Sequence, residues 1–362
     1  MTQPDFLDTP SGRRIAYRRS DGTGPGVVFL GGFMSDMDGT KAVHLEAWAA
    51  ARGRAFLRLD YSGHGQSGGA FEEGCIGDWA ADAQAVIEAV TEGPLLLVGS
   101  SMGVWIGCLM TQRLGARVAG FVGIAGAALA AEFDELDSLH MRVGALPLYP
   151  TNALKYNLTW STDGLINEYC NPCDAIVDGE RVKTAPLEDY ELLGHDGVEY
   201  ECFNTSGGLG TLPETLAGKA RDVSYRSIRY PGHCDILKLL LNDLGLERRR
   251  DLLKEIFESA LPRTDQDVVL VYCTAKGRIN GELREKSLIN KTYSSVIDGQ
   301  VWGAIQTTTA AGVLGVVDLM RSGALPSKGF VRQEQVKLAD FLNTEFGSLY
   351  RAGDVTERHK AA

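Results

Sequence analysis

Short apolar runs alternate with helical patterns over the first third of the chain. The runs expected to form buried strands are Val27–Leu30, Ala55–Asp60, Leu95–Val98 and Gly120–Ile124. Helical patterns lie between them at Thr40–Arg52, Ile76–Thr91 and Met102–Leu114. Strands of this kind, separated by helices, are typical of a parallel sheet with helices on both faces. Residues 1–126 are therefore predicted to form an open parallel sheet of the α/β class.

The pattern changes after residue 126. Asp-Gly pairs, which favour tight hairpin turns, occur at Asp178-Gly179, Asp196-Gly197 and Asp298-Gly299. Predicted strands are Glu199–Phe203, Val268–Thr274 and Ser287–Ile297, and predicted helices are Asp235–Leu244, Asp251–Ser259 and Thr308–Ser322. Residues 127–362 are therefore predicted to form a second, α+β domain.

Composition excludes several classes of partner. The chain has 47 acidic and 36 basic residues, a net charge of −11, and no basic run, which argues against nucleic acid and anionic membranes. Its apolar runs are of strand length and its N-terminus is polar, so we expect neither a membrane span nor a signal peptide. Seven cysteines in 362 residues indicate a reducing compartment, and we expect a cytoplasmic protein.

One motif in the first part suggests a nucleophile. Gly99-Ser100-Ser101-Met102-Gly103 follows a predicted strand and precedes a predicted helix, the setting of a G-x-S-x-G nucleophile elbow. Ser101 is the predicted nucleophile, and the alternative is an inert serine in a tight turn. Gly31-Gly32-Phe33 follows an earlier strand, so the backbone N–H groups of Phe33 and Met102 are the predicted oxyanion donors; the alternative is an ordinary turn.

Two other motifs are weaker evidence for a functional site. Gly63–Gly68 matches G-x-G-x-x-G, but Asp60 would repel a phosphate and no helix is predicted directly after Gly68. Cys170-x-x-Cys173 has no second pair or nearby histidine to complete four metal ligands. We therefore predict neither a cofactor nor a metal.

These motifs resemble the first half of the α/β-hydrolase superfamily. The segments Gly31–Ala42 and Asp60–Ser67, followed by the elbow, are most similar to abhydrolase-domain acyl-protein thioesterases and their bacterial relatives. The resemblance covers about residues 1–126. It implies hydrolysis of esters or thioesters, with Ser101 as nucleophile and Phe33 and Met102 as oxyanion donors.

The rest of a hydrolase triad is not evident. Hydrolases of this fold supply an acid and then a histidine after the serine, from loops that follow later strands. The histidines after Ser101 are His140, His195, His233 and His359, and none follows an apolar strand that ends in an acid-bearing loop. We expect structural or surface roles for them; the alternative is that one completes a triad. Without a base, a serine hydroxyl is a weak nucleophile.

The second part carries residues suited to carboxylate recognition. Arg142 and Arg229 could bind a carboxylate through two hydrogen bonds, and the alternative is a structural role for each. From about Ala130 to Tyr350 the chain resembles the saccharopine dehydrogenase family. The segments that carry this resemblance are Arg142–Pro147, Thr159–Tyr169, Phe203–Leu209 and Ile228–His233. The resemblance implies NAD(P)-dependent chemistry on the amine that joins lysine to a dicarboxylic acid, and a homodimer through residues 127–362. Its substrate-side candidates are Arg142, Trp160, Ser161 and Arg229.

The simplest hypothesis is a chimera joined near Gly123–Ala130. Each part lacks what its chemistry needs: the first lacks the downstream acid and histidine, and the second lacks the nucleotide-binding domain that opens its family. We therefore expect a chain without a complete active site that recognises a small molecule, either an acyl ester or thioester or an amino acid. The alternatives are a saccharopine dehydrogenase-like oxidoreductase of lysine metabolism and a working serine esterase or thioesterase. We also expect Thr308–Ser322 to lack the domain on which it packs in its family.

Overall fold

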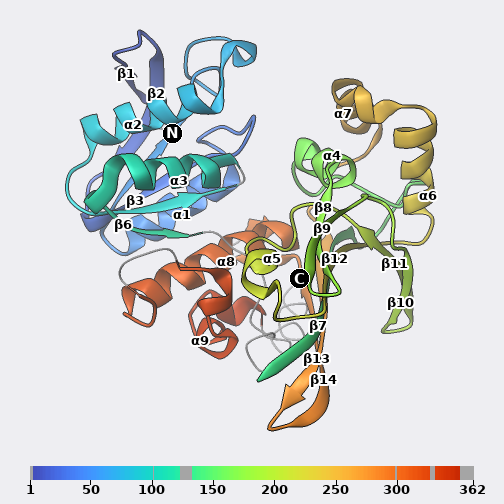
Figure 1. Ribbon diagram of the computed structural model, residues 1–362. Helices are drawn as coiled ribbons and strands as arrows, with labels where there is room; N and C mark the ends of the chain where they lie inside the picture. The colour runs from blue at the N-terminus through green and yellow to red at the C-terminus, as the bar shows by residue number, and fades with distance from the viewer. Residues whose placement is uncertain (1–2, 101, 123–132, 298–299, 327–330, 351–362) are drawn as a thin grey trace. The chain divides into compact units, whose positions relative to one another are not determined.

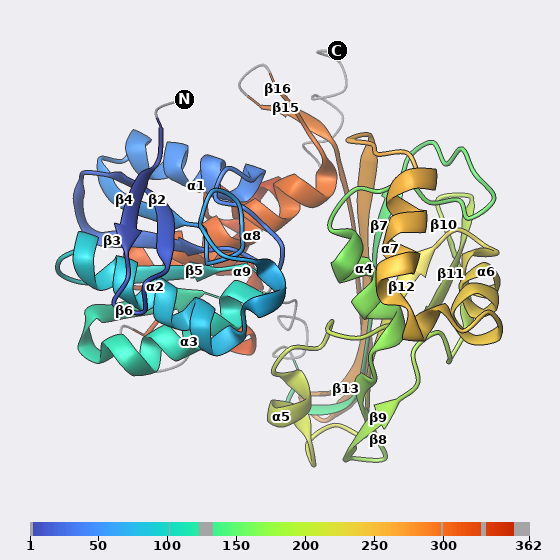
Figure 2. The same ribbon diagram turned by 90° about the horizontal axis from the view of Figure 1, so that it is seen from above.

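The chain folds into two compact units (Figures 1 and 2). The computed structural model describes residues 3–100, 102–122, 133–297, 300–326 and 331–350. The first unit combines Met1–Ile124 with Val313–Val331, and the second combines Ala125–Gly312 with Arg332–Ala362. The division after Ile124 lies close to the expected boundary, but the segment Val313–Val331 belongs with the first unit and not with residues 127–362.

The first unit is built on a six-stranded sheet with strand order β1-β2-β4-β3-β5-β6. Its strands are β1 (Asp5–Asp8), β2 (Arg14–Ser20), β3 (Thr23–Leu30), β4 (Arg54–Leu59), β5 (Leu95–Gly99) and β6 (Val118–Val122). Its first three helices are α1 (Thr40–Ala51), α2 (Ile76–Val90) and α3 (Met102–Leu114). β3 to β6 pair in parallel, as predicted, whereas β1 and β2 add an antiparallel edge. The α/β fold class is confirmed.

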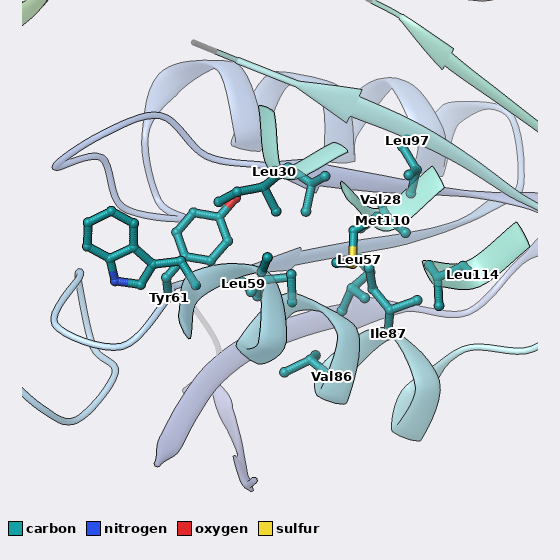
Figure 3. Packing of buried hydrophobic residues seen from close by; sticks show 14 of the residues in the cluster. Val28, Leu30, Leu57, Leu59, Tyr61, Val86, Ile87, Leu97, Met110 and Leu114 are labelled. Atoms are coloured by element: carbon teal, nitrogen blue, oxygen red, sulfur yellow. The ribbon is translucent and has the colours of Figure 1, made fainter. Parts of the chain in front are cut away.

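The core of this unit lies between the sheet and helices α2 and α3 (Figure 3). The labelled side chains are Val28, Leu30, Leu57, Leu59, Tyr61, Val86, Ile87, Leu97, Met110 and Leu114. Burial of this apolar surface is the main force that holds the layers together. Helix α1 contacts β3 and β4 with residues outside this cluster.

Helix α8 (Ala304–Arg321) contributes to both units. Its first turn is held in the second unit by Asp267, whose carboxylate accepts hydrogen bonds from the backbone N–H groups of Ala304 and Ile305. Its last turns belong to the first unit, where Leu314 and Val317 are buried. This helix was expected to lack the domain on which it packs in its family, and in the structure its second half belongs with the six-stranded sheet of the first unit.

The second unit is built on an eight-stranded sheet with main order β10-β11-β12-β7-β13-β14. Its strands are β7 (Glu135–Pro147), β8 (Cys173–Val177), β9 (Glu180–Thr184), β10 (Glu191–His195), β11 (Val198–Asn204), β12 (Asp222–Arg229), β13 (Asp267–Ile279) and β14 (Glu282–Tyr293). β15 (Ser295–Ile297) and β16 (Gln300–Trp302) form a separate pair. β7 and β12 are parallel, and the other pairs of the eight-stranded sheet are antiparallel.

This unit also contains helices besides α8. They are α4 (Thr162–Cys170), α5 (Leu212–Leu216), α6 (His233–Lys238), α7 (Arg250–Ala260) and α9 (Leu338–Leu342). Residues of α4, α6 and α7 share one buried cluster with Phe203 of β11. Two of the three predicted Asp-Gly turns join β8 to β9 and β10 to β11, with positive φ at both residues of each turn. The third, Asp298-Gly299, lies outside the described residues. Within the described ranges, no helix has the length and apolar character needed to cross a bilayer.

Candidate functional site

The strand-to-helix turn predicted for the nucleophile joins β5 to α3. β5 ends at Gly99 and α3 begins at Met102, so two serines make the connection. A Cβ atom on Gly103 would lie 2.0 Å from the Leu30 carbonyl oxygen, and the Ser100 amide donates a 3.0 Å hydrogen bond to the same oxygen. The turn is therefore pressed against the end of β3. Ser101 itself lies outside the described residues.

The loop after β3 carries the other predicted oxyanion donor, Phe33. The Phe33 ring is 42% exposed and packs edge-on against Phe71, with 5.0 Å between ring centroids. Met34 has φ +52°, a left-handed conformation that costs energy for a residue with a side chain. Met102 is the first residue of α3, where a helix leaves its N–H groups without intrahelical partners. The two predicted donors thus lie on the loop and at the helix start that the prediction requires.

A buried carboxylate fixes this loop. Asp60 is 1% exposed and accepts hydrogen bonds from the amides of Met37 (2.5 Å) and Gln66 (2.8 Å). Burial raises the pKa of Asp60 to about 6, although these two hydrogen bonds favour its charged form. Asp60 thereby ties the loop after β3 to the loop after β4.

The glycine-rich segment Gly63–Gly68 has the wrong geometry for a nucleotide phosphate. A phosphate-binding loop presents free backbone N–H groups at the start of a helix. Here the amides that already donate within the protein are those of Gly63, His64, Gln66, Ser67 and Gly68. A Cβ atom on Gly65 would lie 2.1 Å from an Asp60 carboxylate oxygen, so this segment wraps a negative charge. These residues do not fit the NAD(P) that the saccharopine dehydrogenase resemblance implies.

The histidines that follow Ser101 all belong to the second unit. His140 Nδ1 lies 2.8 Å from Ser224 Oγ, and His195 Nε2 lies 3.3 Å from the Asp196 carboxylate in the hairpin turn. His233 is 1% exposed, and His359 lies outside the described residues. Each described histidine thus has a local partner in its own unit.

Arg229 is the centre of a buried polar cluster in the second unit. It is 2% exposed, and its Nε donates a 2.9 Å hydrogen bond to the Tyr169 hydroxyl. Its guanidinium lies over the rings of Tyr156 and Tyr169, 5.3 and 5.6 Å from their centroids. A terminal nitrogen lies 3.6 Å from the Glu168 carboxylate. The cation is therefore held by aromatic faces, a hydroxyl and one carboxylate.

Burial shifts the titration of two neighbours of Arg229. It raises the pKa of Glu168 to about 7, although the charge of Arg229 acts in the opposite direction. It also lowers the pKa of His233 to about 3, with a further decrease from Arg229. His233 Nδ1 faces the Leu154 carbonyl oxygen at 2.8 Å and therefore carries the proton, so Nε2 accepts the Tyr169 hydroxyl at 3.0 Å.

The structure brings together some of the predicted substrate-side residues and separates others. Trp160 Nε1 donates a 3.0 Å hydrogen bond to the hydroxyl of Tyr156, which lies beneath Arg229. Ser161 is the N-cap of α4, and its Oγ accepts from the Gly164 amide at 3.3 Å. Arg142, in contrast, lies opposite Arg226 in the β7–β12 register. Because side chains alternate between the faces of a strand, Arg229, three residues after Arg226, is on the other face of the sheet.

Arg142 belongs to an ion-pair network on the face of the sheet opposite Arg229. It forms two hydrogen bonds with the Glu191 carboxylate. Arg226 pairs with Asp189 and lies 3.6 Å from Glu191. The Arg142 guanidinium is therefore already occupied by a carboxylate of its own chain.

Sequence reasoning missed several residues around these sites. Tyr156, Glu168 and Tyr169 complete the cluster around Arg229. Glu168 and Tyr169 lie inside the resembling segment Thr159–Tyr169, whereas Tyr156 lies just before it. Lys41, whose Nζ lies 3.2 Å from Ser100 Oγ, was also missed. Its signal was available, because Lys41 is the only lysine among residues 1–124. No group of three or more potential metal ligands occurs in the part of the chain that the structure describes.

Comparison with known protein families assigns each part of the chain. The model of the saccharopine dehydrogenase C-terminal domain matches residues 120–350, and the model described as serine aminopeptidase, S33, matches residues 26–155. Apo saccharopine dehydrogenase (L-Glu forming) from Saccharomyces cerevisiae aligns with a TM-score of 0.53 and 13% identity, over 84% of this chain and 93% of that chain. At this identity the likeness concerns the fold. Both resemblances drawn from the sequence are confirmed.

Curated relatives match the first part. The mitochondrial palmitoyl-protein thioesterase ABHD10 of Bos taurus is 36% identical over 159 residues, 44% of this chain and 49% of that protein. The human protein of the same name is 35% identical over 167 residues, 46% of this chain and 52% of that protein. The chain spans about half the length of these relatives.

The names of these relatives correct the expected cellular location. The proteins from Bos taurus, Pongo abelii and Homo sapiens are all called mitochondrial, so the expectation of a cytoplasmic location is wrong. The physical reason is that cysteine usage separates oxidising from reducing surroundings. It does not separate one reducing compartment from another.

Proposed function

The chain belongs to the family that carries the saccharopine dehydrogenase C-terminal domain, and on that premise we propose a fusion protein with two incomplete sites. In its hydrolase-like unit, Ser101 accepts acyl groups from esters or thioesters but turns them over slowly. In its saccharopine dehydrogenase-like unit, the region around Arg229 binds an amino acid through its carboxylate. The whole chain binds small molecules but does not complete the reaction of either the hydrolase or the saccharopine dehydrogenase family.

One observation carries the hydrolase part of this proposal. The turn between β5 and α3 is pressed against β3 as a nucleophile elbow requires, while every histidine that follows Ser101 in the sequence belongs to the second unit. In hydrolases of this fold the triad histidine and acid follow the serine on the same sheet. The proposed oxyanion donors are the amides of Phe33 and Met102. They stabilise the tetrahedral intermediate without a base to activate the serine.

The binding part of the proposal centres on Arg229. Its Nε and one terminal nitrogen already donate within the protein, and the other terminal nitrogen faces Glu168 at 3.6 Å. An amino-acid carboxylate would compete with Glu168 for that nitrogen, and Trp160 and Ser161 lie on the segment that borders it. Arg142 is on the other face of the sheet and is paired with Glu191, so it takes no part in this proposed site.

Neither alternative activity has its own supporting geometry. A saccharopine dehydrogenase-type oxidoreductase needs a nucleotide site, and Gly63–Gly68 does not fit one. A complete esterase needs a histidine at Ser101, and the described histidines after Ser101 all have partners within the second unit. We therefore assign ester or thioester turnover only the residual rate that oxyanion donors and binding provide, roughly 10³ to 10⁴ over water.

A pre-steady-state assay tests the hydrolase part. With p-nitrophenyl acetate we expect a burst of p-nitrophenol that approaches one equivalent of protein, followed by slow release. Ser101→Ala should remove most of the burst. Rapid steady turnover that needs both Ser101 and one of His140, His195 or His233 would show that a triad has formed, and the proposal would be wrong.

A further inference from the structure

Lys41 and Ser100 form a close pair beside the elbow. Lys41 Nζ lies 3.2 Å from Ser100 Oγ, within hydrogen-bond distance. The two residues are 59 positions apart in the sequence. Because Lys41 is the only lysine in residues 1–124, no other amine of that segment can take its place.

Ser100 is held rigidly by the backbone around it. Its amide donates to the Leu30 carbonyl oxygen at 3.0 Å, and its own carbonyl oxygen accepts from the Gly103 amide at 2.9 Å. These two bonds fix the residue between the end of β3 and the start of α3. The direction of its Cα–Cβ bond is therefore set by the same packing that shapes the elbow.

Lys41 is positioned by the loop after β3. That loop is tied down at Met37 by Asp60 and at Asp38 by Arg58, whose guanidinium lies 2.7 Å from the Asp38 carboxylate. Arg58 is 5% exposed and also pairs with Glu46 on α1 at 2.7 Å. Lys41 follows in the first turn of α1, so its side chain starts from an anchored backbone.

The surroundings of Lys41 favour loss of its proton. Among the described residues Lys41 forms no ion pair with a carboxylate, and its recorded partner is the Ser100 hydroxyl. Lys41 as a whole is an exposed residue, but the atoms packed around its ammonium group lower its pKa by desolvation. A lysine without a counter-ion, hydrogen-bonded to a serine hydroxyl, is the arrangement in which a neutral amine accepts the serine proton.

We propose that Ser100 and Lys41 form a catalytic dyad in which Ser100 is a second acylation site, independent of Ser101. Neutral Lys41 Nζ takes the proton from Ser100 Oγ as that oxygen forms a bond to the acyl carbon of an ester or thioester. The bond from the acyl carbon to the leaving oxygen or sulfur breaks, and Lys41 returns its proton to the leaving group. Water then hydrolyses the acyl-serine with Lys41 as base. This inference rests on the proposed acyl chemistry of the same unit, but it assigns a different nucleophile and a base.

Covalent labelling with a fluorescent fluorophosphonate separates the two serines. The probe transfers phosphorus to a serine oxygen and releases fluoride, and peptide mass spectrometry identifies the modified residue. The full chain is labelled as wild type, Ser100→Ala, Ser101→Ala, the double variant, Lys41→Met, Lys41→Arg and Lys219→Met. Lys219 is an exposed lysine of the second unit and serves as the matched control. Thermal melts of all variants report folding.

The dyad predicts a specific pattern. Ser101→Ala keeps a labelled fraction on Ser100, and Lys41→Met in that background lowers its rate by about 100-fold, the typical contribution of a general base. The rate on Ser100 rises with pH as Lys41 loses its proton, and it levels off below the ordinary lysine pKa of about 10.4 because the pKa of Lys41 is lowered. Lys41→Arg keeps the charge and reach but cannot give up its proton, so it should be as slow as Lys41→Met. Lys219→Met should behave as wild type.

The outcomes for the two proposals differ. If Ser101→Ala abolishes all labelling, the dyad is wrong and the Ser101 proposal stands. If Ser100→Ala abolishes labelling while Ser101→Ala leaves it unchanged, the dyad stands and the Ser101 proposal is wrong. If Lys41→Arg restores labelling of Ser100 to the wild-type rate, Lys41 has only a structural role and the dyad is overturned.

Discussion

Arg229 donates a hydrogen bond to the hydroxyl of Tyr169, and both side chains are almost completely buried, at 2% and 1% exposure. The same hydroxyl faces Nε2 of His233 at 3.0 Å. The tyrosine thus accepts from a cation on one side and donates to a neutral imidazole on the other. The cluster is a polar network in an otherwise apolar core, and the first two predictions test it.

Replacing Arg229 with methionine should destabilise the second unit. Above about pH 7, where Glu168 is charged, removal of Arg229 leaves that carboxylate without its partner and costs up to about 3 to 5 kcal/mol. Urea unfolding, followed by intrinsic tryptophan fluorescence, measures the change. In the Arg229→Met background, Glu168→Gln should recover part of the loss because it removes the stranded carboxylate. An additive double variant would contradict the pairing.

The pKa of Glu168 gives the second unit a defined pH dependence. Burial raises that pKa from 4.5 to about 7, so the protonated carboxyl is favoured in the folded state. Its contribution to stability is complete below about pH 4.5 and is lost as the pH rises through about 7. Glu168→Gln should therefore show a smaller fall in unfolding free energy than wild type between these pH values.

His233 also contributes to the pH dependence of the unfolding free energy, and this contribution cancels when wild type and Glu168→Gln are compared at the same pH. Burial lowers the pKa of His233 to about 3, so His233 destabilises the fold as the pH drops below about 6.5, equally in wild type and variant. Equal slopes for wild type and Glu168→Gln between pH 4.5 and 7 would show that Glu168 titrates normally.

Gly103 is a test of the elbow geometry. A Cβ atom there would lie 2.0 Å from the Leu30 carbonyl oxygen, so Gly103→Ala must push α3 away from β3. Overpacking of this kind costs about 1 to 3 kcal/mol. We expect a lower melting temperature and loss of labelling at the elbow. The matched control is Gly77→Ala on α2, where the nearest atom to the new Cβ atom is Cys75 Sγ at 3.6 Å; it should be neutral or stabilising.

Leu314 tests the contribution of α8 to the first unit. The side chain is fully buried in the part of α8 that belongs to that unit, and Leu314→Ala should cost about 2 to 5 kcal/mol. Hydrogen exchange should rise in peptides from the six-stranded sheet of the first unit. The control, Arg321→Ala on the same helix, removes an exposed ion pair with Asp318 and should change little. Faster exchange confined to β7 and β13 would contradict the division into units.

Sequence patterns predicted those helices and strands of the first unit whose apolar positions are set by burial in the core. Helix α3 begins and ends where predicted, at Met102 and Leu114, because apolar periodicity and the preceding glycines are local signals. Strand β1 was missed since Asp5–Asp8 is short and mostly exposed. Its pairing with β2 comes from tertiary contacts that a four-residue pattern does not encode.

The candidate sites show the same limit. The elbow was predictable because its glycines and serines are contiguous. The pair Lys41 and Ser100 was not, since 59 residues separate them and only the packing of two loops brings them together. Arg142 and Arg229 were grouped by a shared chemistry, but strand register places them on opposite faces.

The discontinuous first unit has a consequence for biosynthesis. Ala125–Gly312 is translated after most of the first unit and before the part of α8 that completes it. At about 5 to 20 residues per second, this delay lasts roughly 10 to 40 s. During that interval the six-stranded sheet leaves the ribosome without its last helix, so the nascent chain presents an apolar face to chaperones. The hydrolase-like unit, although encoded first, is therefore completed only after most of the second unit has been synthesised.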